Sequence, residues 1–512
     1  MLLAGLVAAA QAQVVDSGGS GIAFNTDLSQ YDSTATQGTA SRTLASRAAD
    51  AGLLPQEFGA KCDGTTDDSV AMAAWLAKAA AGVHLALPGG TCVFKSPLVA
   101  PTGGVNGASI TGAGDGTSVL LYAGSGTTGD LLTIGDGTNN YLDWTLSGFR
   151  IASSTALASP ATGLHLKLFS RGTVANVTLD GQDGNGNLYN GIWFDGADTN
   201  VLTGGVISAQ NDGLRVNGRS GTGADLFFSS TKIAPANGHS QSVGVHLGGG
   251  FGGFVCVDAS IIGNGVNVKI DNGLVSTANR EVDLLAGCAL DTAETGDNVY
   301  VNDTLASGGT LVFNGWFASS AAGNGINIVS WPSGNVSINA QEIYNNWLDG
   351  VRVQDTTAYV SVGGGTKIRN NGTSGAGWGI NATSATVRIT PGAPPINNSS
   401  GTYAPNTGIF SAANPPSTPG FWVDTNGLVH EWGTATTATG AANAVVSATV
   451  TFPKAFPTEA LSCSVTNLNF PNGIVQQSTG SQNLTATGVQ VFAISAATVS
   501  TGIALGWQCI GY

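Results

Sequence analysis

The chain has 512 residues, of which 75 are glycine, 42% are hydrophobic and only 10% carry a charge. This composition favours many corners and few surface helices, and the length allows two or three domains. The formal net charge of −14 argues against a nucleic-acid-binding surface, so we expect no nucleic-acid partner.

The first residues, Met1 to Ala12, are apolar and end in an Ala-x-Ala-like site, as a secretory signal peptide does. They lack a positively charged start, and the apolar run is too short to span a membrane. The alternative is an apolar segment that packs against copies of itself or attaches to a larger assembly. We interpret residues 1–47 together as an N-terminal arm or attachment segment.

Residues 48–98 are predicted to form a cap. The stretch Glu57-Phe-Gly-Ala-Lys-Cys-Asp-Gly-Thr-Thr-Asp-Asp68 leads into a helix, with Asp67 or Asp68 as its N-cap. The apolar side of this helix is assigned to Val70, Ala73, Ala74 and Ala77, with Trp75 and Leu76 beside them. A helix placed here would cover the open backbone edge of the first coil of a solenoid.

Residues 99–398 repeat a short phrase, which consists of a turn residue, usually a glycine, and then alternating apolar and polar residues. The phrase starts at Asn190, Asp212, Asn324, Asp349 and Trp378, with looser copies at Thr162, Val243 and Asp297. Alternation predicts a strand with one buried face, and Asn-Gly or Asp-Gly predicts the corner before it. Successive phrases start 22 to 31 residues apart, which leaves room for two or three strands and none for a helix. This spacing predicts a parallel β-helix rather than a propeller or a leucine-rich repeat.

Residues 399–419 are rich in Pro, Gly, Ser and Asn and are predicted to be a linker. Residues 420–512 hold short alternating runs between turn residues, which predicts a separate β-sandwich. The six cysteines show no metal-binding spacing. Cys62 with Cys92, and Cys463 with Cys509, would form disulfides in an oxidising compartment, whereas reduced buried thiols are the equally weighted alternative.

Stretches at both ends of the chain resemble known families. The Glu57 to Asp68 stretch, the helix and Leu87-Pro-Gly-Gly-Thr91 resemble the opening of the pectate-lyase-like β-helix superfamily. With the preceding Arg42-Thr-Leu-Ala-Ser-Arg47 they are similar to bacteriophage tailspikes and tail fibres. The last domain, which closes with Trp507-Gln-Cys-Ile-Gly-Tyr512, resembles the C-terminal domain of phage tail-fibre proteins. The resemblance implies an all-β fold, with a right-handed parallel β-helix, an N-terminal capping helix and a C-terminal β-sandwich.

The resemblance also implies a function. The function that the resemblance implies is that of a homotrimeric virion tail spike or tail fibre, which attaches to other virion tail proteins through its N-terminal segment. Its β-helix would bind host surface polysaccharide, with or without cleaving it by hydrolysis or elimination. Two alternatives remain open. One is a secreted, monomeric bacterial β-helix lyase or hydrolase of polysaccharide, and the other is an architectural fibre without catalysis.

Candidate site residues follow from the chemistry of β-helix hydrolases, which use paired carboxylates on one solvent-facing sheet. Asp195, Asp212 and His239 are the catalytic candidates. The order Asn190-Gly, then Asn211-Asp212-Gly, then Gly238-His239 resembles the three-coil motif of polygalacturonases, without its paired aspartates and later Arg-x-Lys. The alternatives are repeat corners for the aspartates and an exposed loop for His239.

Aromatic side chains in or beside the coils are candidates for binding. Trp193, Trp316 and Trp347 are chosen to stack on sugar rings, the alternative being the core or a subunit interface. No metal site and no cofactor are expected from the sequence.

Overall fold

The computed structural model describes residues 32–34, 41–43 and 52–511, apart from short gaps within the last range. These gaps are 126–127, 181–183, 197, 219–224, 249–252, 273–280, 285–286, 305–308, 316, 356, 364, 383–385, 390–397, 404–407, 412–419, 424–428, 454, 457, 470–475 and 496–497. The N-terminal segment Met1–Ala12, the predicted sugar-binding residue Trp316 and the closing Tyr512 lie outside the described residues.

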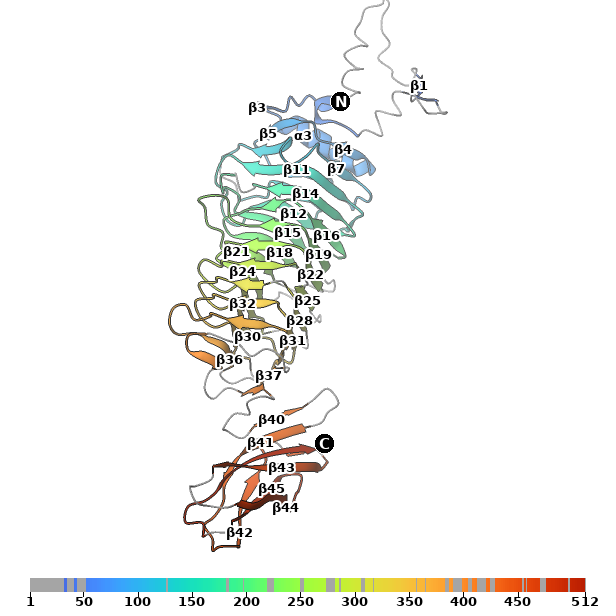
Figure 1. The fold of residues 1–512 in the computed structure, drawn as a ribbon. Coiled ribbons are helices and arrows are strands. Elements are labelled where there is room, and N and C mark those ends of the chain that lie inside the picture. Colours follow the sequence, from blue (N-terminus) through green and yellow to red (C-terminus); the bar gives the residue numbers. More distant parts are fainter. Residues whose placement is uncertain are drawn as a thin grey trace, which may run out of the picture.

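The central part of the chain is a solenoid in which each strand pairs, in parallel, with the equivalent strand of the next coil (Figure 1). One face is a twelve-stranded sheet with one strand from each coil. Its strands are β6 (Leu98–Val99), β9 (Leu132–Ile134), β12 (Thr162–Lys167), β15 (Asn190–Asp195), β18 (Asp212–Asn217), β21 (Val243–Leu247), β24 (Val266–Asp271), β27 (Val299–Asn302), β30 (Ile326–Ser330), β33 (Val351–Val353), β36 (Trp378–Ala382) and β38 (Gly401–Tyr403).

The remaining strands of the coils form a second, larger parallel sheet, to which most coils contribute two strands. Its strands are β3 (Asp63–Asp67), β4 (His84–Ala86), β5 (Gly90–Phe94), β7 (Ser109–Thr111), β8 (Ser118–Tyr122), β11 (Thr145–Ser153), β14 (Thr173–Leu179), β16 (Asn200–Thr203), β17 (Val206–Ile207), β19 (Asp225–Ser229), β20 (Lys232–Ile233), β22 (Gly253–Val257), β23 (Ser260–Ile262), β25 (Glu281–Leu284), β26 (Ala289–Asp291), β28 (Thr310–Phe313), β29 (Phe317–Ser319), β31 (Asn335–Ile338), β32 (Glu342–Tyr344), β34 (Tyr359–Val362), β35 (Lys367–Arg369), β37 (Thr386–Ile389) and β39 (Gly408–Ser411). A short pair, β10 (Tyr141–Leu142) and β13 (Phe169–Ser170), lies beside them, and β1 (Asp32–Thr34) pairs with β2 (Ser41–Thr43).

Alternation along each strand explains why the coils stack. In the twelve-stranded sheet Ile192, Leu214, Val245 and Val268 occupy the same inward position of four successive coils, and all are fully buried. Burying one such side chain contributes about 1.5–3 kcal/mol. Every phrase start found in the sequence lies at or next to the start of a strand of this sheet. The predicted fold class is therefore confirmed, as an all-β chain with a parallel β-helix of about ten coils and antiparallel sheets after it.

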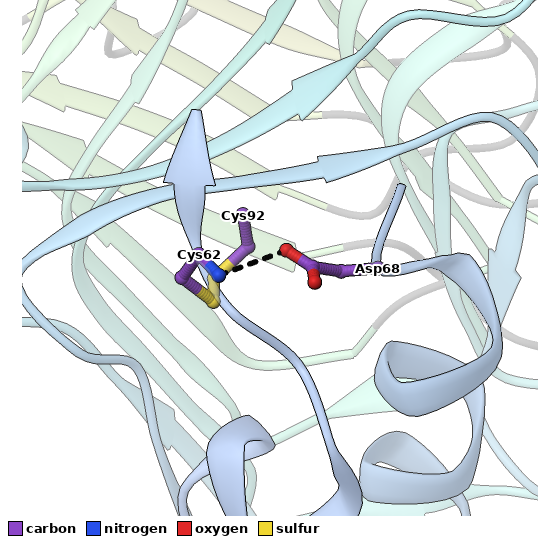
Figure 2. A group of neighbouring side chains, drawn as sticks. All are labelled: Cys62, Asp68 and Cys92. Atoms are coloured by element: carbon purple, nitrogen blue, oxygen red, sulfur yellow. Dashed lines mark hydrogen bonds between the residues drawn. A yellow bond between two sulfur atoms is a disulfide. The ribbon is translucent and has the colours of Figure 1, made fainter. Parts of the chain in front are cut away.

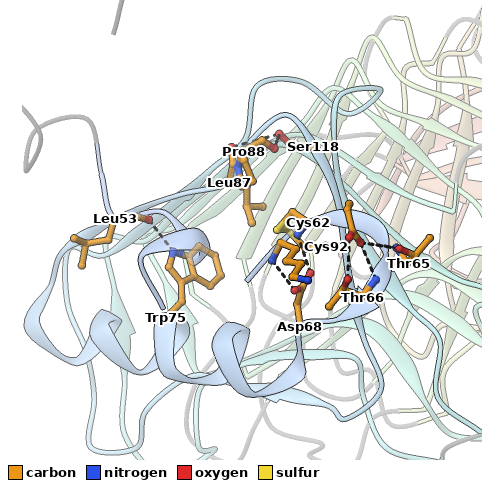
Figure 3. Close-up of a disulfide and its surroundings, with 12 residues drawn as sticks. Leu53, Cys62, Thr65, Thr66, Asp68, Trp75, Leu87, Pro88, Cys92 and Ser118 are labelled. Atoms are coloured by element: carbon orange, nitrogen blue, oxygen red, sulfur yellow. Dashed lines mark hydrogen bonds between the residues drawn. A yellow bond between two sulfur atoms is a disulfide. The ribbon is translucent and has the colours of Figure 1, made fainter. Parts of the chain in front are cut away.

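The N-terminal end of the solenoid carries the helix α3 (Ser69–Leu76), between the short 3-10 helices η2 (Pro55–Phe58) and η3 (Ala77–Ala81). Its buried face differs from the predicted one, because Met72, Trp75 and Leu76 are buried whereas Val70 is 86% exposed. The Trp75 indole donates a hydrogen bond to the Leu53 carbonyl at 2.7 Å (Figure 3). Among the described residues, no helix is both long enough and apolar enough to cross a bilayer.

The Asp68 side chain does not cap this helix, which corrects the sequence-based assignment for that residue. Its carboxylate instead accepts hydrogen bonds from the backbone N–H groups of Lys61 at 2.7 Å and Cys62 at 3.0 Å. Cys62 forms a disulfide with Cys92 on β5 (Figure 3). Asp68 thus ties the chain ahead of β3 to the start of the helix.

The C-terminal part has antiparallel sheets and a hydrophobic core of its own. One sheet contains β40 (Gly420–Val423), β41 (Val429–Thr436), β46 (Ala504–Gly511) and β43 (Ala460–Asn469), and the other β42 (Val445–Thr451), β45 (Gly488–Ser495) and β44 (Gln476–Gln482). A disulfide joins Cys463 to Cys509 across β43 and β46. The third disulfide, Cys256–Cys288, joins neighbouring coils of the solenoid and was not anticipated from the sequence.

Candidate active site

The outward side chains of the twelve-stranded sheet form a ladder along the solenoid axis, with one residue from each coil. In five successive strands, β12 to β24, the ladder reads His165, Trp193, Arg215, His246 and Lys269. Neighbouring strands lie about 4.8 Å apart, so consecutive side chains touch. Four of these five residues are basic, in a chain that has only 18 Lys and Arg and 5 His among 512 residues. This stretch is much denser in basic side chains than the chain as a whole, and we take it as the candidate site.

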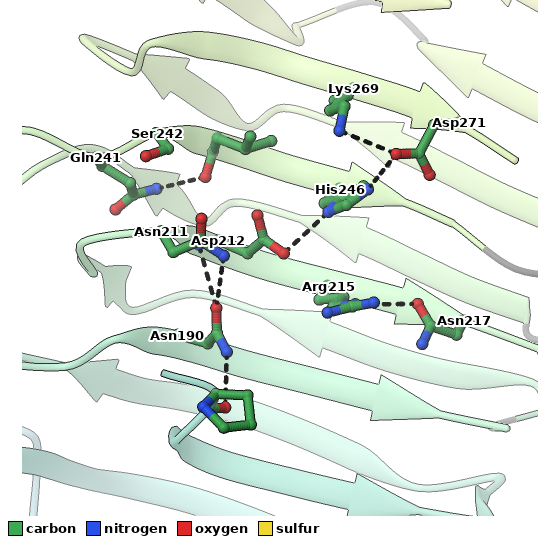
Figure 4. A network of polar contacts seen from close by, with 12 residues as sticks. Asn190, Asn211, Asp212, Arg215, Asn217, Gln241, Ser242, His246, Lys269 and Asp271 are labelled. Carbon is green, nitrogen blue, oxygen red and sulfur yellow. Dashed lines mark hydrogen bonds and ion pairs between the residues drawn. The ribbon is translucent and has the colours of Figure 1, made fainter. Parts of the chain in front are cut away.

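His246 lies between two carboxylates that come from the coils before and after its own (Figure 4). Its Nδ1 is 2.9 Å from Asp212 Oδ2, and its Nε2 is 3.0 Å from Asp271 Oδ2. A carboxylate only accepts hydrogen bonds, so both ring nitrogens must carry a proton for both bonds to form. Lys269 Nζ lies 2.9 Å from the same Asp271 oxygen.

The environment sets the charge of this group. Burial of the ring favours neutral imidazole, but the hydrogen bonds to Asp212 and Asp271 outweigh burial, and the pKa of His246 is raised above its ordinary 6.5. Burial also opposes ionisation of Asp271, yet His246 and Lys269 together lower the pKa of Asp271 to about 2. The group therefore favours a protonated His246 ring more than a free histidine does, next to an Asp271 that is ionised at neutral pH.

His165, three coils before His246 on the same ladder, also lies between two carboxylates, but only its Nδ1 is hydrogen-bonded, because its buried Nε2 has no hydrogen-bond partner among the described residues. Its Nδ1 is 2.6 Å from Asp130 Oδ2, and its Nε2 is 3.5 Å from Asp195 Oδ2. The His165 side chain is only 5% exposed, against 13% for that of His246. The chain thus carries two acid–imidazole–acid groups on one face, roughly 14 Å apart from the spacing of three strands.

Trp193 and Arg215 lie between the two histidines. The Trp193 ring is stacked on the His165 ring, with centroids 4.2 Å apart and planes within 7°. On the opposite side, the Arg215 guanidinium lies 4.8 Å from the centroid of the indole. Both faces of Trp193 are therefore covered by neighbours, which leaves its edge, and not its face, for a sugar.

A recurring aspartate explains how the coils position these histidines. An aspartate stands at the start of a strand of this sheet, or two residues before it, in four coils, and each carboxylate accepts a hydrogen bond from the ladder side chain of the next coil. The four pairs are Asp130 with His165, Asp212 with His246, Asp297 with Asn327, and Asp349 with Asn381. An asparagine donor is thus sufficient to join two coils. The histidines at two of these positions add a titratable ring to a structural contact.

Three of the predicted site residues, Trp193, Asp195 and Asp212, are brought together here, and their roles remain predictions. His239 lies apart, on an exposed loop where its backbone N–H donates to Ala236 and its ring lies against Gly186. Trp347 is 53% exposed on the loop between β32 and β33, away from the ladder.

His165, Arg215, His246 and Lys269 were missed as site residues. The first three were nevertheless visible in the sequence, because each is the fourth residue of a repeat phrase.

Metal-ligating residues converge at one place among the described residues, where Cys62, Asp68 and Cys92 lie together at the cap (Figure 2). The two sulfur atoms are joined in a disulfide, so they offer no thiolate to a metal. In the ladder, the two carboxylates beside each histidine face different ring nitrogens and do not converge on one point.

Comparison with known families supports the two resemblances. Residues 56–249 match the family of rhamnogalacturonase A and epimerase proteins with a pectate-lyase-like fold. Residues 423–512 match the C-terminal domain of gp53-like tail fibre proteins. A search of the curated proteins finds no match.

Several solved structures are similar. An R2-type pyocin tail fibre from P. aeruginosa is 29% identical over 19% of this chain and 36% of its own length, with a TM-score of 0.16. The A-module of an Azotobacter vinelandii mannuronan C-5 epimerase is 16% identical over 71% of this chain and 99% of its own, with a TM-score of 0.42.

An Acinetobacter phage tailspike is 11% identical over 77% of this chain and 76% of its own, with a TM-score of 0.45. Of the pyocin tail fibre described above, the part that aligns with this chain is only about a third. On the two family matches, the chain combines a pectate-lyase-like β-helix domain with a phage tail-fibre C-terminal domain.

Proposed function

We propose that the protein is a phage tail spike or tail fibre that binds host surface polysaccharide on the ladder of β12 to β24 and cleaves it there. One observation carries the catalytic part of the proposal, namely that both ring nitrogens of His246 lie within hydrogen-bond distance of a carboxylate, Asp212 on one side and Asp271 on the other, on the outer face of the β-helix. The tail-fibre C-terminal domain supports the virion part.

Arg215 supplies the contact for an acidic group of the polysaccharide. Among the described residues it has no carboxylate partner, since its contacts are the Trp193 ring and, at 3.3 Å, the Asn217 side chain. Arg369 makes a similar ring contact with Tyr344, at the same 4.8 Å, but its charge is already paired with Glu342 at 2.8 Å. The guanidinium of Arg215 is thus the one that retains donors for a carboxylate, phosphate or sulfate group.

His246 is assigned the role of proton donor to the glycosidic oxygen, because its two carboxylate neighbours raise its pKa and so favour the protonated ring. Asp212, only 3% exposed, fixes the ring through Nδ1. Asp271 is the more exposed partner at 29%, so a sugar oxygen can replace it at Nε2. The freed Asp271 carboxylate is then available as the base, for a water in hydrolysis or for a sugar C–H in elimination.

The test is to incubate the full chain with purified capsular polysaccharides and lipopolysaccharide O-chains from a panel of bacteria. New reducing ends report cleavage of either kind, and the ultraviolet absorbance of an unsaturated uronide marks elimination. We expect His246→Gln to lower kcat by about 100-fold or more, the usual contribution of a general acid.

The matched control is His239→Gln, which changes an exposed histidine outside the ladder and should leave kcat unchanged. Binding without cleavage by the wild-type chain would support a non-catalytic fibre. Cleavage that survives His246→Gln would overturn the assignment of the proton donor.

The rest of the organisation is proposed as follows. Residues 1–47 attach the chain to other virion tail proteins, 48–98 cap the solenoid, 99–398 form it, 399–419 link it to the last domain, and 420–512 bind the receptor or join the subunits. We propose a homotrimer in the virion tail. The competing assignment, a secreted monomeric enzyme, is distinguished from it by mass in solution.

A further inference from the structure

His165 takes no part in the proton transfer assigned above, yet it is the most enclosed side chain of the ladder segment. Its two ring nitrogens face Asp130 and Asp195, and its ring plane is parallel to that of Trp193. The hydrogen bond between Nδ1 and Asp130, together with burial and the stacked indole, restricts the plane of this ring. The plane of the indole that is stacked on it is restricted in turn.

The other coils show what a histidine adds at this position. Asn327 and Asn381 donate to Asp297 and Asp349 at 2.8 Å, so an amide alone joins two coils. After His246 the next ladder residue is Lys269, which has no ring, and after Asn327 it is Arg352. Only at His165 is the aspartate-bound ring followed by a second flat ring stacked upon it, within the described part of this ladder.

The stack ends on the guanidinium of Arg215. That group is held by an indole face, and among the described residues it has no carboxylate partner, so its position depends on the plane of Trp193. We propose that His165 is a positioning residue, which acts through the stacked Trp193 ring to orient the Arg215 guanidinium toward an acidic group of the glycan. This inference rests on the proposed function for the identity of the ligand, but not for the arrangement of the three side chains.

Two substitutions distinguish the effect of the stacked ring from the effect of the hydrogen bond to Asp130. His165→Asn keeps a donor for Asp130, as Asn327 and Asn381 do for their aspartates, and removes the ring. His165→Phe keeps a ring for the stack and removes the donors. The control Phe317→Leu removes a ring from the Phe317–Tyr344 pair, whose centroids are 6.2 Å apart on another sheet.

The first measurement is kinetic and uses an acidic polysaccharide that the wild-type chain cleaves. A stacked aromatic pair contributes about 0.5–1.5 kcal/mol, so His165→Asn should raise KM by about two- to tenfold while kcat stays near the wild-type value. His165→Phe should restore part of the wild-type KM, and Phe317→Leu should have no effect. A lower kcat at unchanged KM, or equal losses in His165→Asn and His165→Phe, would overturn the proposal.

The second measurement needs no glycan. The rate at which phenylglyoxal modifies Arg215, followed by mass spectrometry of the digested chain, should rise in His165→Asn and rise less in His165→Phe, which keeps the stacked ring without the hydrogen bond to Asp130. If the wild-type chain cleaves no polysaccharide, the proposed function fails, and this rate still decides the role of His165. An Arg215 rate in His165→Asn equal to that of wild type would refute the positioning role.

Discussion

At the scale of single residues, the hydrogen bond between a ladder side chain and the aspartate of the preceding coil is made by asparagine in some coils and by a titratable histidine in others. Where asparagine donates to the corner aspartate, as Asn381 does to Asp349, the donor itself carries no titratable group. Where histidine donates, as His246 does to Asp212 and Asp271, both bonds require the protonated ring. The stability of these coils should therefore vary with pH.

The sign follows from the two pKa shifts. The pKa of His246 is raised in the folded state, so its stabilisation is complete below pH 6.5, the ordinary histidine value, and is lost as the pH rises through the folded-state pKa. The pKa of Asp271 is lowered from 3.8 to about 2, so its stabilisation is present above pH 3.8 and is lost as the pH falls toward 2. The Tm difference between wild type and His246→Gln, measured by calorimetry, should be largest between these limits and shrink on both sides. A difference that stays constant with pH would contradict this account.

Sequence reasoning reached part of this site for a physical reason. Trp193 and Asp212 belong to repeat phrases, and the phase of a phrase can be read from its alternation. The histidines were missed because the fourth residue of the phrase changes type from coil to coil, so no fixed motif marks it. The register of neighbouring coils brings His165, Trp193 and Arg215 together. These residues are 22 to 28 positions apart in the sequence, and the sequence alone does not reveal that register.

At the scale of elements, hydrophobic periodicity predicted the capping helix but not the face of the helix that is buried. Helix α3 is rich in alanine and apolar on nearly all sides, so hydrophobic periodicity does not single out the face that packs on the first coils. Residue size decides instead, because Trp75 and Met72 fill the space over the core while small Ala73 and Ala74 are exposed. The strands, by contrast, alternate clearly, which is why the solenoid could be predicted and the helix face could not.

This gives a test within a single helix. Trp75 is 1% exposed and hydrogen-bonded to Leu53, so Trp75→Ala should lower the free energy of unfolding of the capped solenoid by about 3–5 kcal/mol. Val70, assigned to the apolar side from the sequence, is 86% exposed. Val70→Ala should therefore change the free energy of unfolding by no more than about 0.5 kcal/mol. Denaturant unfolding followed by circular dichroism compares the two variants. Equal effects would mean that the helix does not pack as described.

At the scale of the whole molecule, the two sheets of the solenoid present different outer surfaces. The ladder of the twelve-stranded sheet is basic and polar. On the larger sheet, Val201, Phe227 and Val255 form an outward apolar row on β16, β19 and β22, in register, and Phe227 is 44% exposed. A row of this kind is suited to burial against another copy of the chain, whereas the ladder is suited to a hydrated ligand.

The mass in solution tests this division of surfaces. If the chain forms the proposed homotrimer through the apolar row, light scattering on a sizing column should give three times the 51.2 kDa of one chain. Phe227→Glu places a charge in that row and should shift the mass toward one chain. Tyr359→Glu, which changes a side chain that is 69% exposed on β34 outside the row, should leave the trimer intact. A trimer unaffected by Phe227→Glu would place the contact elsewhere. A wild-type monomer would contradict the proposed homotrimer and favour the secreted enzyme. The proposed cleavage of polysaccharide through His246 could still be measured in that case.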